Sequence, residues 1–411
     1  MDMEAEEART IGAQLRMIRK RRGLGLKVAA DLAGISKPYL SMLERGERGF
    51  NRRGLLEDLA AAVGCSVVDL TGQPYHLPGR QSVDTFAAVP GIQLALHDYG
   101  PDDVPDVSPR PLEQLVLWAE EANEHCAQAR YSLAAKDVGA LVTELQAHAL
   151  TARDAERDKA VTGAVVACFV AGVVTGNVAD VVLSATAAQR GYDLATRYGT
   201  PGLVGFARWY WSLTLTRLAA RHRASSLLTA GIDELAPAIN LTGSDTLPTE
   251  MVGLMHLARA HTAAREKRAD VAGMHLAEAE YLAARIGEHN GMLQHFGPTN
   301  VALWRLGIGI ELSDSGRAYE ETMRTELDLS ALGSAERESS LLLNLARALV
   351  YSRKDRDAEA IRHLDAADRL APQRIRMDPI ARELVNVLYR RAPRRVWELD
   401  SLCNRFGTGK G

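Results

Sequence analysis

Lysine and arginine side chains are concentrated in one short part of this 411-residue chain. Residues 9–53 hold 12 Lys and Arg against three acidic residues, a net charge of +9, whereas the rest of the chain has a net charge of −12. These cationic groups donate hydrogen bonds to phosphates and base edges, and a small basic segment on an acidic body is typical of a nucleic-acid binder. A basic run on a solvated helix face, such as Arg19–Arg22, is the alternative that composition leaves open.

Residue types that carry catalysis do not stand at catalytic spacings. His256 and His261 are five positions apart, whereas the two metal ligands of HExxH are four apart. Gly307–Gly309 lacks the third glycine of a dinucleotide-binding loop, and Gly407–Gly411 has no following helix to bind a phosphate. The four cysteines form no CxxC pair and are expected to be buried, reduced thiols. We therefore expect a protein that is not an enzyme and that has neither a cofactor nor a metal site.

The basic segment lies within a predicted bundle of five short helices. Apolar residues recur at helical spacing from Ile11, and a glycine at position 34 separates two short helices because it can adopt a left-handed conformation. Ser36 is a good N-cap for the second of these, and Pro38 is tolerated in its first turn. Two short helices across a glycine turn predict a helix-turn-helix. The five helices are expected near residues 11–22, 26–33, 36–46, 53–63 and 66–70.

At residues 30–48 the chain resembles the lambda-repressor-like XRE helix-turn-helix family, most specifically in Ser36-x-x-Tyr39-Leu40-Ser41-x-Leu43-Glu44-x-Gly46. The resemblance covers about residues 9–72 and implies that the third helix enters the major groove of DNA. Matched position by position, it implies base contacts by Lys37, Pro38, Ser41 and Met42. It implies phosphate contacts by Lys27, Ser36, Arg48, Asn51, Arg52 and Arg53, which position the domain without specifying sequence. Two departures, Leu26 and the lack of glutamines on the third helix, prevent copying a site preference.

Family members bind DNA as dimers with half-sites about one helical turn apart, so the resemblance also implies a homodimer. We expect the dimer contacts to come from the body that follows. Residues 74–111 hold seven of the 15 prolines and are predicted to be irregular, either a linker or a wrapping arm. The predicted division is residues 1–73 for the DNA-binding domain, 74–111 for the linker, 112–405 for a helical body and 406–411 for a flexible tail.

The body is predicted to be an alanine-rich helical repeat, which makes the whole protein all-α. Helical patterns from about Leu112 onward, with short breaks, predict roughly 12 to 14 helices. Residues 341–374 carry Ala348, Ala360, Ala367 and Pro372 at tetratricopeptide (TPR) spacing, and residues 253–286 repeat the pattern with Ala260, Ala272 and Ala279. The most apolar stretch, Val161–Val174, is too short for a membrane span and is expected to be a buried helix. The acidic N-terminus is unlike a signal peptide, so we expect a cytoplasmic protein with no membrane partner.

A TPR-like body offers a concave binding surface. A helix-turn-helix domain on such a body resembles a set of actinobacterial regulators, and the segment Phe296–Trp304 is similar to theirs. The chain also resembles the peptide-sensing quorum receptors, in architecture alone. The resemblance implies a signalling peptide or small-molecule ligand. Polar and aromatic residues expected on inner helices are the candidate ligand contacts, namely Arg208, Trp211, His295, Asn300, Trp304, Asn344 and Arg347. Packing aromatics or solvated polar residues are the alternative at each position.

We therefore expect a sequence-specific, dimeric transcriptional regulator whose body receives a signal. The alternative is a TPR protein-interaction module in which the helix-turn-helix only tethers the body to DNA. Substitution of the base-contacting residues separates the two, because only the regulator would lose its sequence-specific function.

Overall fold

The computed structural model describes residues 10–75, 80–325, 327–352, 356–392 and 396–408. Over these ranges the regular elements are α-helices and two single-turn 3-10 helices, and the only β-type pairing is an isolated bridge between His289 and Phe296. The predicted all-α class is confirmed.

The N-terminal head, residues 10–75, contains the five predicted helices: α2 (Ile11–Arg21), α3 (Leu26–Leu32), α4 (Lys37–Glu44), α5 (Arg53–Val63) and α6 (Val67–Thr71). Gly34 has a φ of +63°, which explains the glycine in the turn between α3 and α4. The Ser36 hydroxyl accepts a hydrogen bond from the Tyr39 N–H at 3.2 Å, so this residue caps α4 as its type predicts.

Helix α4 is held against α2 by a close backbone approach and a buried ion pair. A Cβ at Gly12 would lie 2.2 Å from the Leu43 carbonyl oxygen, so only glycine allows this crossing. The Arg19 guanidinium donates to both carboxylate oxygens of Glu44, at 2.5 and 2.8 Å, in a buried fork. The orientation of α4 is therefore fixed by the rest of the head.

The segment between head and body differs from the prediction. Residues 74–111 were expected to be irregular, but they contain α7 (Arg80–Ala87) and α8 (Val89–His97). Pro90 stands in the first turn of α8, where its missing N–H costs nothing, and Ile92 is fully buried against the body. Residues 98–111 are irregular, as expected, but are fastened to the body, since the Gln146 side chain donates to the carbonyls of Gly100 and Asp103. Residues 76–79 lie outside the described ranges.

The body begins at Leu112, where the helical pattern begins in the sequence, and has 17 α-helices over its described part, three of them with six residues or fewer. The first half comprises α9 (Leu112–Ala127), α10 (Tyr131–Ala134), α11 (Val138–Thr151), α12 (Asp154–Asn177), α13 (Val181–Tyr198), α14 (Pro201–Arg217), α15 (Arg221–Leu235) and η1 (Ala236–Ala238). The second half comprises α16 (Leu247–Arg265), α17 (Ala269–Ile286), η2 (Gly291–Leu293), α18 (Pro298–Glu311), α19 (Ser315–Arg324), α20 (Leu329–Leu332), α21 (Ala335–Ser352), α22 (Asp357–Leu370), α23 (Pro372–Met377), α24 (Pro379–Arg391) and α25 (Trp397–Phe406).

The two predicted repeats are helical hairpins. Helices α16 and α17 pack along each other, as do α21 and α22. The alanines that define the pattern have no exposed surface, which allows the paired helices to approach closely: Ala260, Ala272, Ala279, Ala348, Ala360 and Ala367. Pro372 begins α23 directly after α22 has ended, as its place in the repeat predicts.

Helix α12 contains the predicted apolar stretch. Of the described residues, this is the one helix long and apolar enough to cross a membrane, and 78% of its apolar window is buried inside the protein. Neighbouring helices α9, α11 and α13 pack against it. The expected buried core helix is confirmed.

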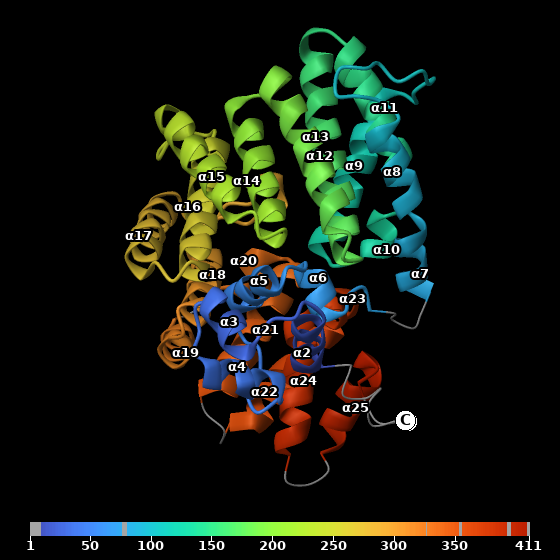
Figure 1. The fold of residues 1–411 in the computed structure, drawn as a ribbon. Coiled ribbons are helices and arrows are strands. Elements are labelled where there is room, and N and C mark those ends of the chain that lie inside the picture. The colour runs from blue at the N-terminus through green and yellow to red at the C-terminus, as the bar shows by residue number, and fades with distance from the viewer. Residues whose placement is uncertain (1–9, 76–79, 326, 353–355, 393–395, 409–411) are drawn as a thin grey trace.

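The head packs against the concave side of the curved body (Figure 1). In that view the body runs from α8–α14 at the top, through α15–α19 on the left, to α21–α25 at the bottom, with the head in front of the lower half. The hydrophobic core of the head is continuous with that of α18–α25, whereas residues of α8–α17, with Phe296 and Val301, form a second core. The head is therefore packed as part of the molecule.

The end of the body also differs from the predicted boundary. Phe406, assigned to a flexible tail, is the last residue of α25 and is 1% exposed. Gly407 follows with a φ of +64° and caps the helix. Residues 409–411 of the predicted tail lie outside the described part of the chain.

Candidate functional site

The predicted base-contacting residues share the outer face of α4. Lys37 and Pro38 are exposed and Ser41 and Met42 are partly exposed, whereas Leu40 and Leu43 are fully buried on the opposite side. Lys37 makes no hydrogen bond or ion pair with any described residue, so its three N–H donors are available for a base edge. This face can therefore present one donor-rich end and two apolar contacts to the major groove.

Arg45 is a further polar residue on this surface, and the sequence analysis did not predict it as a DNA contact. Its guanidinium donates to the Ser41 hydroxyl at 2.6 Å and forms an ion pair with Glu47 at the same distance. All three side chains are at least partly exposed, so Arg45 can exchange these partners for DNA. No short motif distinguishes it in the sequence, because its position depends on where α4 ends.

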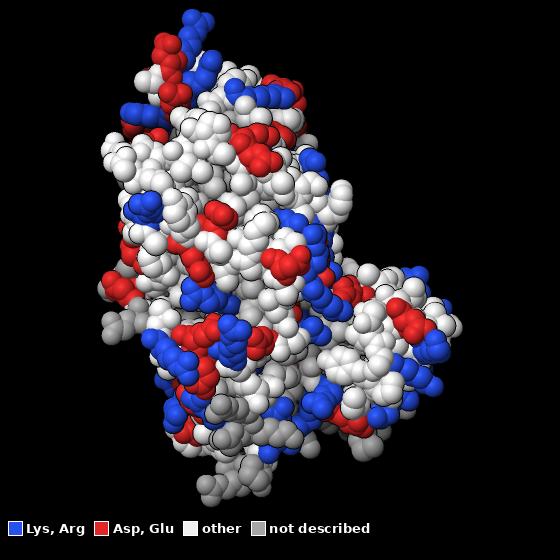
Figure 2. Space-filling model, turned by 90° about the vertical axis from the view of Figure 1, so that its left-hand side faces the viewer, with Lys and Arg blue, Asp and Glu red and all other residues white. Residues whose placement is uncertain are grey.

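Four of the six predicted phosphate contacts remain on the open surface of the head. Arg48 is exposed, Arg52 is partly exposed at the start of α5, and Lys27 forms only an exposed ion pair with Asp31. Ser36 is exposed while its hydroxyl caps α4. In Figure 2 the head is the lobe at the right, and Lys and Arg side chains lie along its outer edge with acidic side chains between some of them.

The other two predicted phosphate contacts face the body. The Arg53 guanidinium forms an ion pair with Asp378, and the Asn51 carbonyl accepts a hydrogen bond from Arg347 at 2.6 Å. For Arg53 this corrects the prediction. The partly buried carboxylate of Asp378, at the N-cap of α24, binds the guanidinium and so ties Arg53 to the body.

A carboxylate from the body caps the first turn of α5. The Glu311 carboxylate accepts hydrogen bonds from the backbone N–H groups of Arg53 and Gly54, at 3.1 and 3.3 Å. It also pairs with the Arg347 guanidinium at 3.0 Å. Burial opposes ionisation of Glu311, but Arg347 and Arg265 hold the pKa of its carboxyl at about 2. Since α5 has no side-chain cap of its own, the body completes this end of the helix.

A second buried carboxylate, from α5, fixes the head to the middle of the body. Glu57 receives hydrogen bonds from Arg265 at 2.7 Å and from Arg221 at 2.6 Å. Arg221 also donates to Asp58 and to the Gly54 carbonyl. The Arg265 and Glu57 side chains are both buried, and this burial lowers the pKa of Arg265. Together with the Glu311 contacts, these pairs determine how the head sits on the body.

A cavity of about 420 Å³ lies between the head and both halves of the body. Head residues in its wall include Arg53, Leu56, Glu57, Val67, Val68 and Gln73. Body residues in its wall come from helices far apart in sequence, among them Tyr131, Phe169, Trp209, Tyr210, Arg217, Arg265, Asn300, Trp304, Arg337, Asn344, Arg347 and Arg374. Its size falls within the range of about 300–1,000 Å³ that is typical of small-molecule sites.

Four of the seven candidate ligand contacts line this cavity: Asn300, Trp304, Asn344 and Arg347. Arg347 donates to the Asn344 side chain at 2.8 Å, so these two form one polar unit. Asn300 is fully buried, and its amide donates to the His295 carbonyl while its own Oδ1 has no partner in the described part of the chain.

The other three candidates do not line the cavity. Arg208 pairs with Glu234 at 2.5 Å and contacts Tyr192, and Trp211 packs on the same tyrosine ring at 5.0 Å between centroids. His295 is buried behind Asn300, and burial lowers the pKa of its imidazole to about 4. Arg208, Trp211 and His295 therefore pack between helices near the cavity and do not line it.

Three arginines that the sequence analysis did not predict as ligand contacts lie at one end of the cavity. Arg217, Arg337 and Arg374 come from α14, α21 and α23, and the Glu336 carboxylate lies among them. Arg374 donates to Glu336 at 2.9 Å. Burial opposes ionisation of Glu336, yet Arg374 and Arg337 hold the pKa of its carboxyl at about 2. Nothing local in the sequence connects these positions, because only the curvature of the body brings them together.

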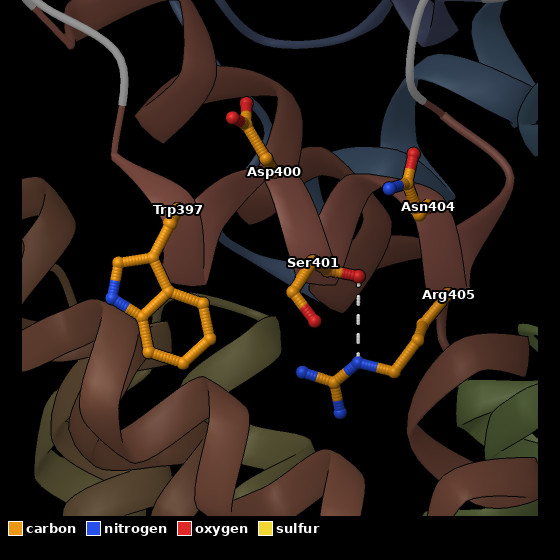
Figure 3. Close-up of a pocket in the computed structure, with 5 residues that line it drawn as sticks. All are labelled: Trp397, Asp400, Ser401, Asn404 and Arg405. Atoms are coloured by element: carbon orange, nitrogen blue, oxygen red, sulfur yellow. Dashed lines mark hydrogen bonds between the residues drawn. The ribbon is translucent and has the colours of Figure 1, made fainter.

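A second recess lies at the surface of α25 (Figure 3). It is lined by Trp397, Asp400, Ser401, Asn404 and Arg405. The Arg405 guanidinium is bound to Asp365, Asp368 and the Ser401 carbonyl, and the Trp397 ring is 70% exposed. All the lining residues come from one helix, so this recess is a surface depression of α25.

No group of three or more potential metal ligands occurs among the residues that the structure describes. The same residues show four free thiols, with Cys126, Cys168 and Cys403 buried and Cys65 partly buried.

Comparison with known proteins supports the assignment of the head. Residues 10–71 match the helix-turn-helix domain family. The chain is similar to Bacillus thuringiensis PlcR, in a crystal structure with the peptide PapR7 and DNA, with 13% sequence identity and a TM-score of 0.36 over 92% of this chain and 99% of PlcR. No significant match occurs among curated proteins. The head is thus a helix-turn-helix domain, and it is joined to an all-helical C-terminal body.

Proposed function

We propose that this protein is a sequence-specific transcriptional regulator that binds DNA as a homodimer and changes its DNA affinity when a peptide or small molecule occupies the cavity. It acts by binding and not by catalysis, and it works in the cytoplasm.

The DNA-binding part of the proposal is supported by the face of α4. Lys37, Pro38, Ser41 and Met42 point outward together, and Arg48 and Arg52 stand beside them where phosphates would lie. One such domain buries too little DNA surface to be both tight and specific, which is the physical reason for a dimer on two half-sites.

The regulatory part rests on one observation: the wall of the cavity includes residues of the head. Arg53, Leu56 and Glu57 belong to α5, and Arg53 and Glu57 also hold the head on the body. A ligand that displaces or reinforces these contacts has different affinities for two positions of the head. Such a difference is the only means by which a ligand can shift the balance between a DNA-competent and an incompetent state.

The helical segment 80–97 changes how we expect ligand binding to be coupled to DNA binding. An irregular linker at residues 74–111 could have absorbed a change in spacing between two heads. The described part of the segment is instead packed on the body, and Gln73 donates to the Met377 carbonyl at 2.9 Å. The head–body contacts are therefore the elements whose rearrangement we propose.

Selection of bound fragments from a random DNA pool by the full-length protein tests the DNA-binding part. We expect an enriched inverted repeat with half-sites about 10 base pairs apart. Lys37→Ala with Ser41→Ala should abolish the enrichment. The matched control is Lys136→Ala with Ser226→Ala, two exposed body positions, which should leave it unchanged.

No enrichment, with weak and salt-sensitive binding to every fragment, would contradict sequence-specific regulation. It would favour the alternative in which the TPR-like body binds a partner protein. Enrichment of a single half-site, with a monomeric protein in solution, would contradict only the homodimer.

A further inference from the structure

One end of the cavity carries more positive charge than its own carboxylate neutralises. Arg217, Arg337 and Arg374 lie around the carboxylate of Glu336, and the next carboxylate, Asp378, is already paired with Arg53. Each guanidinium has five N–H donors. Arg374 donates one hydrogen bond to the Glu336 carboxylate at 2.9 Å. Arg337 has only longer contacts, at 3.4 Å to the Gln294 side chain and 3.7 Å to the Glu336 carboxylate.

Arg217 is the least engaged of the three. Within the described residues it makes no hydrogen bond or ion pair, although its charge is close enough to act on Glu336, Tyr131 and Tyr210. Arg217 is exposed, so water solvates its guanidinium, and a bound anion would replace that water with charge-assisted hydrogen bonds. The donors of Arg217 are therefore available for an anion at this end of the cavity.

The wall beside this charged end is aromatic. Phe169 contacts both Phe206 and Tyr210, at 5.2 and 4.5 Å between ring centroids, and Trp209 is 1% exposed. The Trp209 indole N–H has no partner in the described part of the chain, so the apolar wall also offers one free donor. An apolar or aromatic group with a single acceptor would satisfy this wall.

We propose that the cavity binds a small organic anion, with its carboxylate, sulfonate or phosphate group between Arg217 and Arg337 and its apolar body against Phe169 and Trp209. This assignment rests on the proposed function for the existence of a ligand and adds its chemical class. A cavity of about 420 Å³ is in the lower part of the range for drug-sized ligands, which favours a small molecule over a longer peptide.

A pair of fluorescent probes tests the charge requirement directly. Anilinonaphthalene sulfonate and N-phenyl-naphthylamine share the same ring system, but only the first carries an anionic group. We expect the full-length protein to bind the sulfonate at one site per chain and at least tenfold more tightly than the neutral amine. A tenfold difference corresponds to about 1.4 kcal/mol.

Variants then locate the anion. Arg217→Gln and Arg337→Gln should each weaken sulfonate binding about tenfold and leave binding of the neutral amine within twofold of wild type. Arg217→Lys should retain more sulfonate affinity than Arg217→Gln, since it keeps the charge. The matched control is Arg324→Gln, an exposed arginine at the end of α19, which should change neither affinity. Retained binding of the neutral amine reports that the cavity of each variant is intact.

Equal affinity for the two probes, or sulfonate binding that is unchanged in both glutamine variants, would overturn the assignment. The same probe added to a DNA-binding assay separates this inference from the proposed function. An anion-selective cavity that leaves DNA affinity unchanged would support the ligand class and contradict sensing. A cavity without anion preference, in a protein whose DNA affinity responds to a neutral compound or peptide, would contradict the ligand class alone.

Discussion

The contact between Glu311 and the head offers a quantitative test of how the body holds α5. Glu311→Gln keeps the shape of the side chain but removes its charge, and its new amide N–H groups oppose the donors that now surround the carboxylate. Those donors are the Arg347 guanidinium and the backbone N–H groups of Arg53 and Gly54. We expect the variant to be folded but destabilised at pH 7.

Two estimates of the magnitude agree. Removing one partner of a buried ion pair costs about 3–5 kcal/mol, because the other charge is left unpaired. Independently, the fall in the pKa of the Glu311 carboxyl from 4.5 to about 2 corresponds to about 3 kcal/mol of folding free energy. Because the folded-state pKa is the lower one, this stabilisation is present above the unfolded-state pKa and is lost as the pH falls from about 5 towards 2.

Urea denaturation followed by circular dichroism, at several pH values between 7 and 3, measures both effects. Wild type should lose stability steeply below pH 5, and Glu311→Gln should start about 3 kcal/mol lower and fall less steeply. The matched control is Glu321→Gln, which breaks an exposed ion pair with Arg317 and should cost less than about 0.5 kcal/mol.

A double variant shows whether the charge pair itself is responsible. Combining Glu311→Gln with Arg347→Met removes both charges, so the double variant should be about 1–3 kcal/mol more stable than the sum of the two single effects predicts. A free energy of unfolding for Glu311→Gln within 0.5 kcal/mol of wild type at pH 7, or strictly additive single effects, would refute this account of the head–body contact.

Three further predictions concern the head and the repeats. Gly12→Ala should lower the free energy of unfolding by about 1–3 kcal/mol, because the new Cβ would meet the Leu43 carbonyl oxygen. Gly25→Ala, whose Cβ would have no atom near it, should not destabilise the protein by this mechanism, and urea denaturation compares the two variants. Ala348→Leu should cost about 1–3 kcal/mol by overpacking the α21–α22 hairpin, and an equal loss in Ala358→Leu, at an exposed position of α22, would contradict that explanation. Arg48→Ala and Arg52→Ala should each reduce the salt dependence of DNA binding by about one phosphate contact in a titration, while Arg53→Ala should leave that slope unchanged because its guanidinium binds Asp378.

Local residue types were sufficient to predict the helices of the head. Ser36 caps α4, Gly34 supplies the left-handed turn, and the apolar spacing places Leu40 and Leu43 inside. These are interactions between residues three or four positions apart, so the sequence itself contains them. The outward face of α4, and with it the candidate base contacts, follows from the same periodicity.

Proline content was a poor guide to the segment between head and body. Pro90 stands in the first turn of α8, where a proline is compatible with a helix, and Ile92 two residues later is buried on the body. The helix is stabilised by packing that the local sequence does not show. The same limitation applied to Phe406, whose burial depends on helices that precede it by many positions.

The sequence alone determined that this protein is all-helical, that its basic N-terminal part forms a helix-turn-helix, and that its alanines pair helices into TPR-like hairpins. All of these depend on short-range periodicity and capping. Only the tertiary structure decided that Arg53 binds Asp378, that Glu311 caps α5, and that arginines of α14, α21 and α23 surround one cavity. The physical reason is that the partner of a buried charge is chosen by the curvature and packing of the whole chain. Its position along the sequence carries no information about that choice.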